Sequence, residues 1–283
     1  MKRIAIQFSG LFRGLRFKEN RDLQYERTVK SFEDQGFEVD TFWFLYDKEL
    51  PLDPEIIPNL STTFNAKDVT IYKDDKIQRL LEKEKILDFY SFPPQYYSTS
   101  IDNAILLNFF GEKTEINDTR VPYGWFKYLY SLQKNNELRK AYQEKYNINY
   151  ELILFVEPPA IPQKCFKAIK NKNVLHISPI TGNDGSFFMG DEKHIDIVSN
   201  MYSFMIKNKK IKTDLNSTQN GVDHLYPAYL KEHCEIKETL PDIERKTRWF
   251  HPLLHAHSTD DQYEKILNEL DSSLEQIKLD FLP

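Results

Sequence analysis

One acidic side chain stands where chemistry is expected, directly after a short apolar run. Leu152–Val156 reads LILFV and is followed by Glu157, Pro158 and Pro159. Such a run predicts a buried β-strand, and ligands of open α/β sheets collect beyond the carboxyl ends of the strands. Glu157 is therefore the best candidate for a contact with a divalent metal ion or a ribose hydroxyl. The alternative is a glutamate that pairs with a lysine at the sheet edge, while the prolines shape the exit of the chain.

A second group of candidates follows the first apolar run, Arg3–Phe8. The letters SGLFRG over residues 9–14 predict a turn, and Arg16 lies just beyond it. An arginine can bind a diphosphate through two parallel hydrogen bonds, and backbone amides of a turn can bind an anion too. We therefore expect an anionic ligand at Ser9, Gly10, Arg13 and Arg16. The alternative for Arg13 is a structural ion pair with a neighbouring acid.

Three further candidate segments lie in the second half of the chain. The letters NDG over residues 183–185 form a strong turn sequence, so Asp184 is either a site carboxylate or a turn aspartate bonded to its own backbone. Asp223 lies at a loop-to-helix junction and fits a helix N-cap first. In HPLLHAH, His255 and His257 can bind a metal ion or a diphosphate. A zinc site that adds His251 is the rival interpretation, and half-buried histidines on an irregular segment are the simplest one.

A sheet is needed to bring these residues together, and the order of the elements predicts one. Strands and helices alternate in the first half of the chain, which favours a mostly parallel sheet with right-handed crossovers and flanking helices, an α/β fold. The predicted strands are Arg3–Phe8, Glu38–Tyr46, Val69–Tyr72, Leu152–Val156, Val174–Ile177 and Phe187–Met189. The predicted helices are Asn20–Gln35, Lys76–Ile86, Tyr123–Tyr146, Gln163–Ile169, Asp191–Lys207, Val222–Lys231 and Asp260–Ile277.

Composition excludes several classes of protein. Hydrophobic residues at 40% and aromatic residues at 14% indicate a packed globular chain, and the net charge of -5 gives no support for a nucleic-acid partner. Cys165 and Cys234 lie far apart, which suggests a reducing compartment. No apolar run approaches the roughly 18–20 residues of a membrane span. Phosphate-loop, dinucleotide and nucleophile-elbow motifs do not occur. We expect a cytoplasmic protein.

Four sequence features, which follow one another along the chain, together resemble the pattern of a known protein family. They are a Ser-Gly-x-x-Arg turn at residues 9–13, a D-x-F-x-x-x-x-D strand at residues 40–47, a helix leading into the sheet over residues 130–154, and an F-x-x-G turn at residues 187–190. Together they resemble glycosyltransferase-like proteins encoded in bacterial capsule and lipopolysaccharide clusters and in large DNA viruses. At the central strand, the Arg-x-Arg-Pro-Asp pattern of that family is replaced by FVEPP, and only Pro158 matches. Asp40 opens its strand and is interpreted as structural.

The resemblance implies a GT-A-like fold in a single domain over residues 1–283. Residues 1–205 would bind a nucleotide-diphosphate sugar, and residues 206–283 would supply acceptor-side and C-terminal helical elements. The implied activity is transfer of the sugar to a hydroxyl of an oligosaccharide acceptor, in surface or capsid polysaccharide synthesis, in the cytoplasm of the cell or of a viral host. The alternative is a non-catalytic glycan- or nucleotide-binding relative without the metal-binding acids.

The resemblance also assigns roles to the candidate residues. It makes Asp184 and Asp223 catalytic candidates and makes a divalent ion, Mn²⁺ or Mg²⁺, a candidate cofactor. The candidate donor contacts are Ser9, Gly10, Arg13, Arg16 and Glu157, and the candidate metal ligands are Glu157, His255 and His257.

Overall fold

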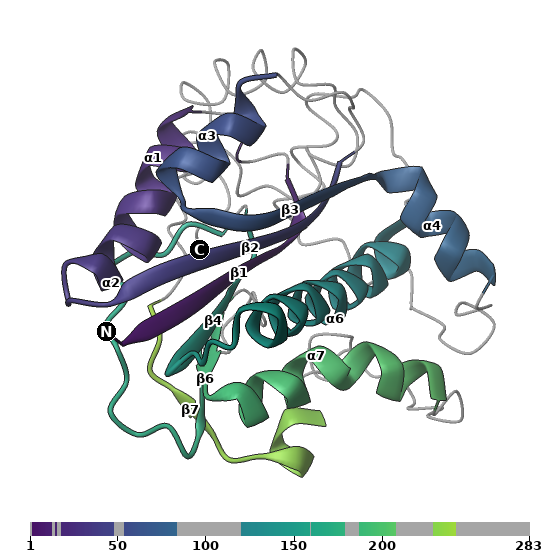
Figure 1. Ribbon diagram of the computed structural model, residues 1–283. Helices are drawn as coiled ribbons and strands as arrows, with labels where there is room; N and C mark the ends of the chain where they lie inside the picture. The colour runs from purple at the N-terminus through teal and green to yellow at the C-terminus, as the bar shows by residue number, and fades with distance from the viewer. Residues whose placement is uncertain are drawn as a thin grey trace, which may run out of the picture. The chain divides into compact units, whose positions relative to one another are not determined.

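A mixed sheet of seven strands forms the centre of the structure. The computed structural model describes residues 2–12, 15, 18–47, 54–83, 120–158, 160–178, 187–207 and 229–241. Within these ranges the strand order is β3-β2-β1-β4-β6-β5-β7 (Figure 1). Neighbouring strands are parallel except where β6 takes part, since β6 runs against both β4 and β5. The predicted α/β class, with a mostly parallel sheet flanked by helices, is confirmed.

The element bounds follow the predicted succession closely. The strands are β1 (Arg3–Leu11), β2 (Glu38–Asp47), β3 (Ala66–Lys73), β4 (Leu152–Val156), β5 (Leu175–Ile177), β6 (Phe187–Gly190) and β7 (Ile236–Glu238). The helices are α1 (Lys18–Tyr25), the π-helical η2 (Glu26–Lys30), α2 (Ser31–Glu33), α3 (Ile56–Thr63), α4 (Asp74–Lys83), α6 (Arg120–Tyr146) and α7 (Glu192–Lys207). All described residues belong to one compact unit, Met1–Ser91 with Arg120–Glu244. The single domain over residues 1–283 extends beyond the described ranges and stays a prediction.

Two described elements were not predicted from the sequence. Helix α3 reads IIPNLSTT, so a proline, a serine and several β-branched residues give it a low helix propensity, and burial of Ile56 and Leu60 holds it in place. Strand β7 has three residues, too few to show a period. It pairs with β5 and adds a strand from the region 206–283, for which only acceptor-side and helical elements were expected.

The predicted helix over Gln163–Ile169 is wrong. These residues have no helical structure, because their backbone groups bond to the first helical stretch instead. The Phe166 N–H donates to Arg27 O at 3.0 Å, and the side chain of Gln35 accepts from Ala168 N–H at 2.9 Å and donates to Phe166 O at 3.0 Å. Tertiary hydrogen bonds therefore replace the local ones that a helix would make.

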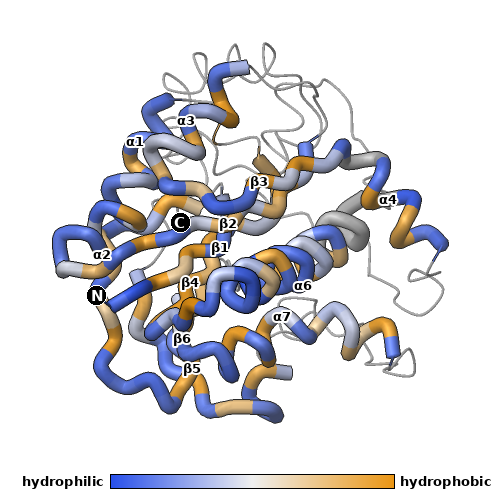
Figure 2. The backbone as a smooth tube through the Cα atoms, in the orientation of Figure 1, coloured by the Kyte–Doolittle hydropathy of each residue, from blue (hydrophilic) through white to orange (hydrophobic). Residues whose placement is uncertain are grey.

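The two faces of the sheet are covered by different helices. On one face Phe8 stacks on Trp43 with ring centroids 3.9 Å apart, and Phe64, which follows α3, meets Trp43 edge-on at 5.1 Å. On the other face Phe42 and Phe44 meet tyrosines of α6. This alternation follows from the two-residue period of a strand. Figure 1 shows α1, α2 and α3 on one side of the sheet and α6 and α7 on the other, and Figure 2 shows hydrophobic residues gathered along the central strands.

Helix α6 is the longest described helix, with 27 residues, and it packs over β1 and β2. Its bounds confirm the helix predicted over Tyr123–Tyr146. The side that meets the sheet carries the fully buried Phe126, Leu129 and Leu132. Within residues 126–146, the exposed positions include the charged Glu137, Lys140 and Glu144. Among the described residues, no helix combines the length and the apolar character needed to cross a membrane.

Asp40 lies near the start of β2, at the end of the sheet opposite to Glu157. Its carboxylate is fully buried, accepts a hydrogen bond from the Tyr150 hydroxyl at 2.8 Å, and lies 3.2 Å from Lys67 Nζ and 3.6 Å from Arg3 Nη1. Burial is the main cause that raises the pKa of Tyr150, and the negative charge of Asp40 is the second. The Tyr150 hydroxyl therefore stays protonated and donates its hydrogen bond to Asp40. These contacts support the structural interpretation of Asp40.

Replacing Asp40 is therefore expected to be costly for folding. Asp40→Ala leaves Tyr150, Arg3 and Lys67 without their shared acceptor, and we expect a loss of about 3 kcal/mol in the free energy of unfolding. Urea denaturation measures this loss. Asp68→Ala, at an exposed aspartate of β3, is the matched control and should change stability by less than about 0.5 kcal/mol. Equal effects of the two variants would contradict the structural role.

Candidate functional site

The carboxyl ends of β1 and β4 lie next to each other and bring two predicted residues together. Phe8 pairs with Val156 in the parallel register, so Ser9 and Gly10 continue β1 beside Glu157, which follows β4. The β1 strand extends through Leu11, further than predicted, so Ser9 and Gly10 belong to the strand and not to a loop. Glu157 is half-buried, and its carbonyl accepts a hydrogen bond from Ala160 N–H at 2.9 Å, which turns the chain away from the sheet.

Gly10 has a backbone that only glycine adopts readily. Its φ is +126°, and a methyl group built on it would lie 3.3 Å from Tyr128 Cδ2 and 3.8 Å from both Glu157 Cγ and Pro158 Cδ. The missing side chain therefore lets the Tyr128 ring and the Glu157 side chain close directly on the main chain. Glycine inside a strand marks either close packing of this kind or a site where a ligand approaches the backbone.

Ser9 is anchored by a residue that sequence reasoning missed. Asn135 of α6 is fully buried, and its Nδ2 lies 2.9 Å from Ser9 Oγ, 2.8 Å from Phe8 O and 3.1 Å from Phe42 O. One amide thus ties α6 to both β1 and β2. Because Ser9 is fully buried under α6, its hydroxyl does not reach the strand ends, and the contact with the nucleotide sugar predicted for Ser9 is not supported by the structure.

Removing the Asn135 amide is expected to loosen this end of the sheet. Asn135→Leu keeps the branched shape of the side chain but removes the N–H groups that two buried carbonyls and a hydroxyl share, and we expect a loss of about 2–3 kcal/mol in the free energy of unfolding. Chemical denaturation measures it. The same substitution at the exposed Asn200 of α7 serves as control. A wild-type-like midpoint for Asn135→Leu would show that the amide does not hold the two strands.

The position of α6 is also held by a buried cation. Arg139 is fully buried, and its guanidinium lies 2.8 Å from Asn136 Oδ1 and 3.3 Å from Glu192 Oε1 at the start of α7. Burial lowers the pKa of Arg139, and the acidic groups of Glu192 and Asp196 oppose that shift. These contacts of Arg139 hold α6 against α7. They therefore stabilise the position of α6, which carries Asn135 and Tyr128, beside the ends of the strands.

A second carboxylate lies at the same edge of the sheet. Asp47 is the last residue of β2, is 1% exposed, and closes the D-x-F-x-x-x-x-D motif at residues 40–47. β2 and β4 flank β1, and Asp47 follows Tyr46, the partner of Leu11, whereas Glu157 follows Val156, the partner of Phe8. Two strand spacings across the sheet and about three residues along it therefore separate Asp47 from Glu157, roughly 14 Å. Asp47 could have been found as a candidate from the sequence, because it directly follows the predicted strand Glu38–Tyr46, as Glu157 directly follows Leu152–Val156.

The described residues do not by themselves fit a resident divalent ion. Mg²⁺ and Mn²⁺ take several oxygen ligands at about 2.0–2.2 Å, which two carboxylates roughly 14 Å apart cannot provide together. Within the described ranges, no group of three or more His, Cys, Asp or Glu side chains is placed to hold a metal. The setting of Glu157 therefore suits a hydrogen-bond acceptor toward a ligand better than a metal ligand.

The other predicted site residues lie outside the described residues. They are Arg13, Arg16, Asp184, Asp223, His255 and His257. The chain leaves β1 at this edge, where Phe12 N–H bonds Tyr46 O at 3.0 Å, and enters β6 at Phe187, opposite Val156. The described ends of both connections therefore meet the sheet beside Glu157.

The glycine of the F-x-x-G motif serves packing at the opposite edge. Gly190 pairs with Ile153 near the start of β4, away from Glu157. A methyl group on Gly190 would lie 2.9 Å from the Cβ of His194, so this glycine allows the first turn of α7 to pack against the strand. Asp191 Oδ1 accepts from the His194 N–H at 3.0 Å and lies 2.6 Å from its Nδ1, which caps α7.

Comparison with known proteins does not assign the chain to a family. The sequence matches no protein-family model. It also has no match among curated proteins. The resemblance drawn from the four motifs therefore stays a prediction, and the function has to be argued from the strand ends of β1 and β4.

Proposed function

We propose that this protein is a glycosyltransferase that binds a nucleotide-diphosphate sugar at the carboxyl ends of β1 and β4 and transfers the sugar to a hydroxyl of an oligosaccharide, in polysaccharide synthesis. The observation that carries the proposal is the juxtaposition of Gly10 and Glu157. A main chain without a side chain, beside a carboxylate that leaves the adjacent strand, can meet both the phosphate and the ribose parts of one nucleotide.

The sheet supports the proposal at the level of the fold. The order β3-β2-β1-β4-β6-β5-β7, in which only β6 runs against its neighbours, gives a mostly parallel sheet flanked by helices, the fold class to which a GT-A-like domain belongs. In sheets of this kind ligands bind beyond the carboxyl ends, near the point where successive strands change direction across the sheet. Here that point lies between β1 and β4, because the chain proceeds from β1 to β2 and β3 and then returns to β4. Fold alone does not define a reaction.

Each candidate residue has a separate task in the proposed reaction. Glu157 accepts hydrogen bonds from the ribose hydroxyls, which fixes the nucleotide against the edge of the sheet. The backbone at Gly10 approaches the diphosphate, and Arg13 neutralises the charge that develops on it as the glycosidic bond to the donor breaks. Asp184 and Asp223 are the candidates for the base that takes the proton from the acceptor hydroxyl.

A panel of nucleotides tests the proposal. The chain is melted with UDP, GDP, CMP, dTDP and their sugars, each with and without Mn²⁺. A ligand that binds only the folded state at about 100 times its Kd stabilises it by about 2.7 kcal/mol, which raises Tm by roughly 5 °C or more. We expect such a shift for one nucleotide and its sugars.

The outcomes separate the transferase from its alternative. A selective shift together with slow hydrolysis of the sugar donor supports the transferase. A selective shift without any release of sugar, in the presence or absence of an acceptor, would favour the non-catalytic nucleotide-binding relative. The absence of a shift with every nucleotide, in a folded sample, would contradict the donor site.

A further inference from the structure

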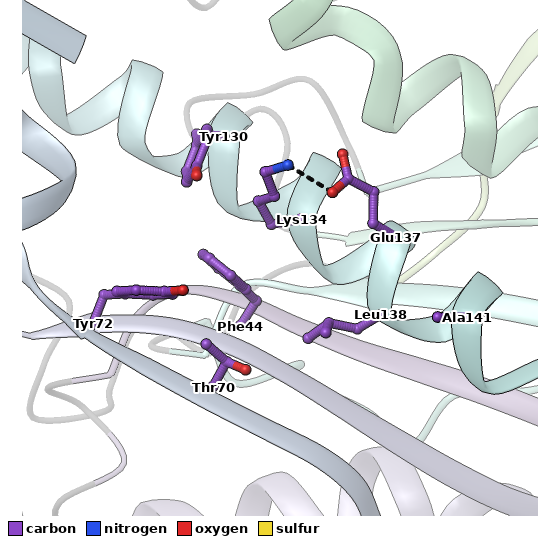
Figure 3. A pocket seen from close by; sticks show the side chains of 8 residues that line it. All are labelled: Phe44, Thr70, Tyr72, Tyr130, Lys134, Glu137, Leu138 and Ala141. Carbon is purple, nitrogen blue, oxygen red and sulfur yellow. Dashed lines mark hydrogen bonds and ion pairs between the residues drawn. The ribbon is translucent and has the colours of Figure 1, made fainter. Parts of the chain in front are cut away.

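A groove of about 430 Å³ lies between α6 and the strands β2 and β3. Figure 3 shows side chains of the strands on one side of it and side chains of α6 on the other. The strand side is formed by Phe44, Thr70 and Tyr72, and the helix side by Tyr130, Lys134, Glu137, Leu138 and Ala141. None of these residues takes part in the proposed donor site.

Aromatic rings form a continuous row along the groove. The ring centroids of Phe44 and Tyr72 are 5.2 Å apart, and those of Phe44 and Tyr130 are 6.0 Å apart. Outside the groove, the buried Tyr202 supports the Tyr130 ring, with ring centroids 5.3 Å apart. Phe44 is buried, whereas Tyr72 and Tyr130 are half-buried. Burial raises the pKa of Tyr130, so its hydroxyl remains protonated at neutral pH. The groove therefore offers ring surface together with hydroxyl groups that donate and accept.

The charged groups of the groove compensate each other. Lys134 Nζ lies 2.6 Å from Glu137 Oε2, and the same ammonium lies 5.7 Å from the centre of the Tyr130 ring (Figure 3). The two side chains are 34% and 50% exposed, so a ligand can reach both. A strongly anionic ligand would find the positive charge of Lys134 already matched.

Rings with paired donors and acceptors suit one class of ligand best. A sugar ring has apolar C–H faces that pack on aromatic rings and hydroxyl groups around its edge that bond to charged and polar side chains. A peptide helix would need a wider apolar surface without an ion pair in it. We propose that this groove binds a short stretch of a neutral glycan, at a site separate from the donor site.

The glycan site goes beyond the transferase reaction and does not depend on it. In the sheet, β3 is three strand spacings from β4, about 14 Å, so the groove lies apart from Glu157. Stacking and hydrogen bonding to a glycan need no nucleotide. Such a site would hold a polysaccharide chain on the enzyme while its end is extended elsewhere.

The test uses the full chain and four neutral tetrasaccharides, maltotetraose, cellotetraose, chitotetraose and mannotetraose, in isothermal titration calorimetry. We expect at least one of them to bind with a roughly millimolar or lower Kd. Ala141→Trp fills the groove from an exposed position of α6, and Tyr72→Ala removes a ring. Each should weaken binding about tenfold. Tyr146→Ala, at a tyrosine of the same helix that is 53% exposed and outside the groove, should leave the Kd unchanged.

Different results would contradict the proposed nucleotide-sugar site and the proposed glycan site. Ala141→Trp should keep the thermal shift of the selected nucleotide, because it does not touch the donor site. The absence of binding for all four tetrasaccharides at millimolar concentration would overturn the glycan site whatever the nucleotide does. Binding that Ala141→Trp leaves unchanged, or tighter binding of an anionic heparin tetrasaccharide than of any neutral one, would overturn it as well.

Discussion

Glu157→Gln is expected to weaken binding of the nucleotide by roughly 10- to 100-fold. The substitution keeps the shape of the side chain but removes the charge that accepts hydrogen bonds from the ribose. Hydrogen bonds to a charged group contribute about 1.5–3 kcal/mol, and each 1.4 kcal/mol is a factor of ten in Kd. The half-buried setting of Glu157 against Gly10 and Pro158 strengthens such bonds compared with those in open water. Isothermal titration calorimetry with the nucleotide selected in the thermal screen measures the change.

The matched control is Glu151→Gln, at the other end of the same strand. Glu151 lies next to Lys172 and 3.2 Å from Lys2, and the hydrogen bond with Lys172 is the largest cause that lowers its pKa. It is a surface carboxylate with partners of its own, and its replacement should leave the Kd for the nucleotide unchanged. Equal losses in the two variants would show a general effect of charge on the chain and would remove Glu157 from the site.

Gly10→Ala is expected to lose about 2–4 kcal/mol of folding free energy and to abolish nucleotide binding. Two costs add up at this position. A residue with a side chain is strained by about 1–3 kcal/mol at a φ of +126°, and the new methyl group would lie 3.3 Å from the Tyr128 ring, which forces a local shift in a packed site. The shift moves Tyr128 or Glu157, so the ligand loses its fit even in the folded fraction.

Gly36→Ala separates the cost of backbone strain from the cost of the steric contact made by the new methyl group. Gly36 also has a positive φ, +84°, but nothing lies within 4 Å of a methyl group built on it. This variant should lose only the backbone contribution, about 1–2 kcal/mol, and bind the nucleotide as wild type does. Urea denaturation and calorimetry on both variants give the comparison. A Gly10→Ala protein that binds nucleotide normally would show that no ligand depends on the bare backbone at Gly10.

The local elements of this fold could be predicted from the sequence because their signals are local. The apolar run Leu152–Val156 is β4 residue for residue, and the helical period of Tyr123–Tyr146 gives α6 with three more residues at its start. The helical segment predicted over Asn20–Gln35 ends close to Gly36, because glycine readily takes the positive φ that follows a helix end. Helix α3 could not be predicted in this way, since burial of Ile56 and Leu60 overrides its poor propensity.

The parts of the site that depend on distant contacts could not be predicted. Asn135 looks like an ordinary polar residue of an amphipathic helix, and only the docked helix shows that its amide reaches Ser9 and Phe42. The burial of the Ser9 hydroxyl follows from the same docking. The groove beside β3 combines Phe44 with Tyr130, which are far apart in the sequence, and no motif indicates it. By contrast, the meeting of Gly10 with Glu157 was foreseeable, because Gly10 lies near the carboxyl end of β1, Glu157 follows β4, and the carboxyl ends of parallel strands share an edge.

A crystal structure of the chain with the nucleoside diphosphate selected in the thermal screen tests the proposed donor site most directly. We expect the diphosphate to lie against the backbone at Gly10, with a ribose hydroxyl within hydrogen-bond distance of the Glu157 carboxylate. A nucleotide bound elsewhere on the chain, with the ends of β1 and β4 free of ligand at saturating concentration, would contradict the donor site.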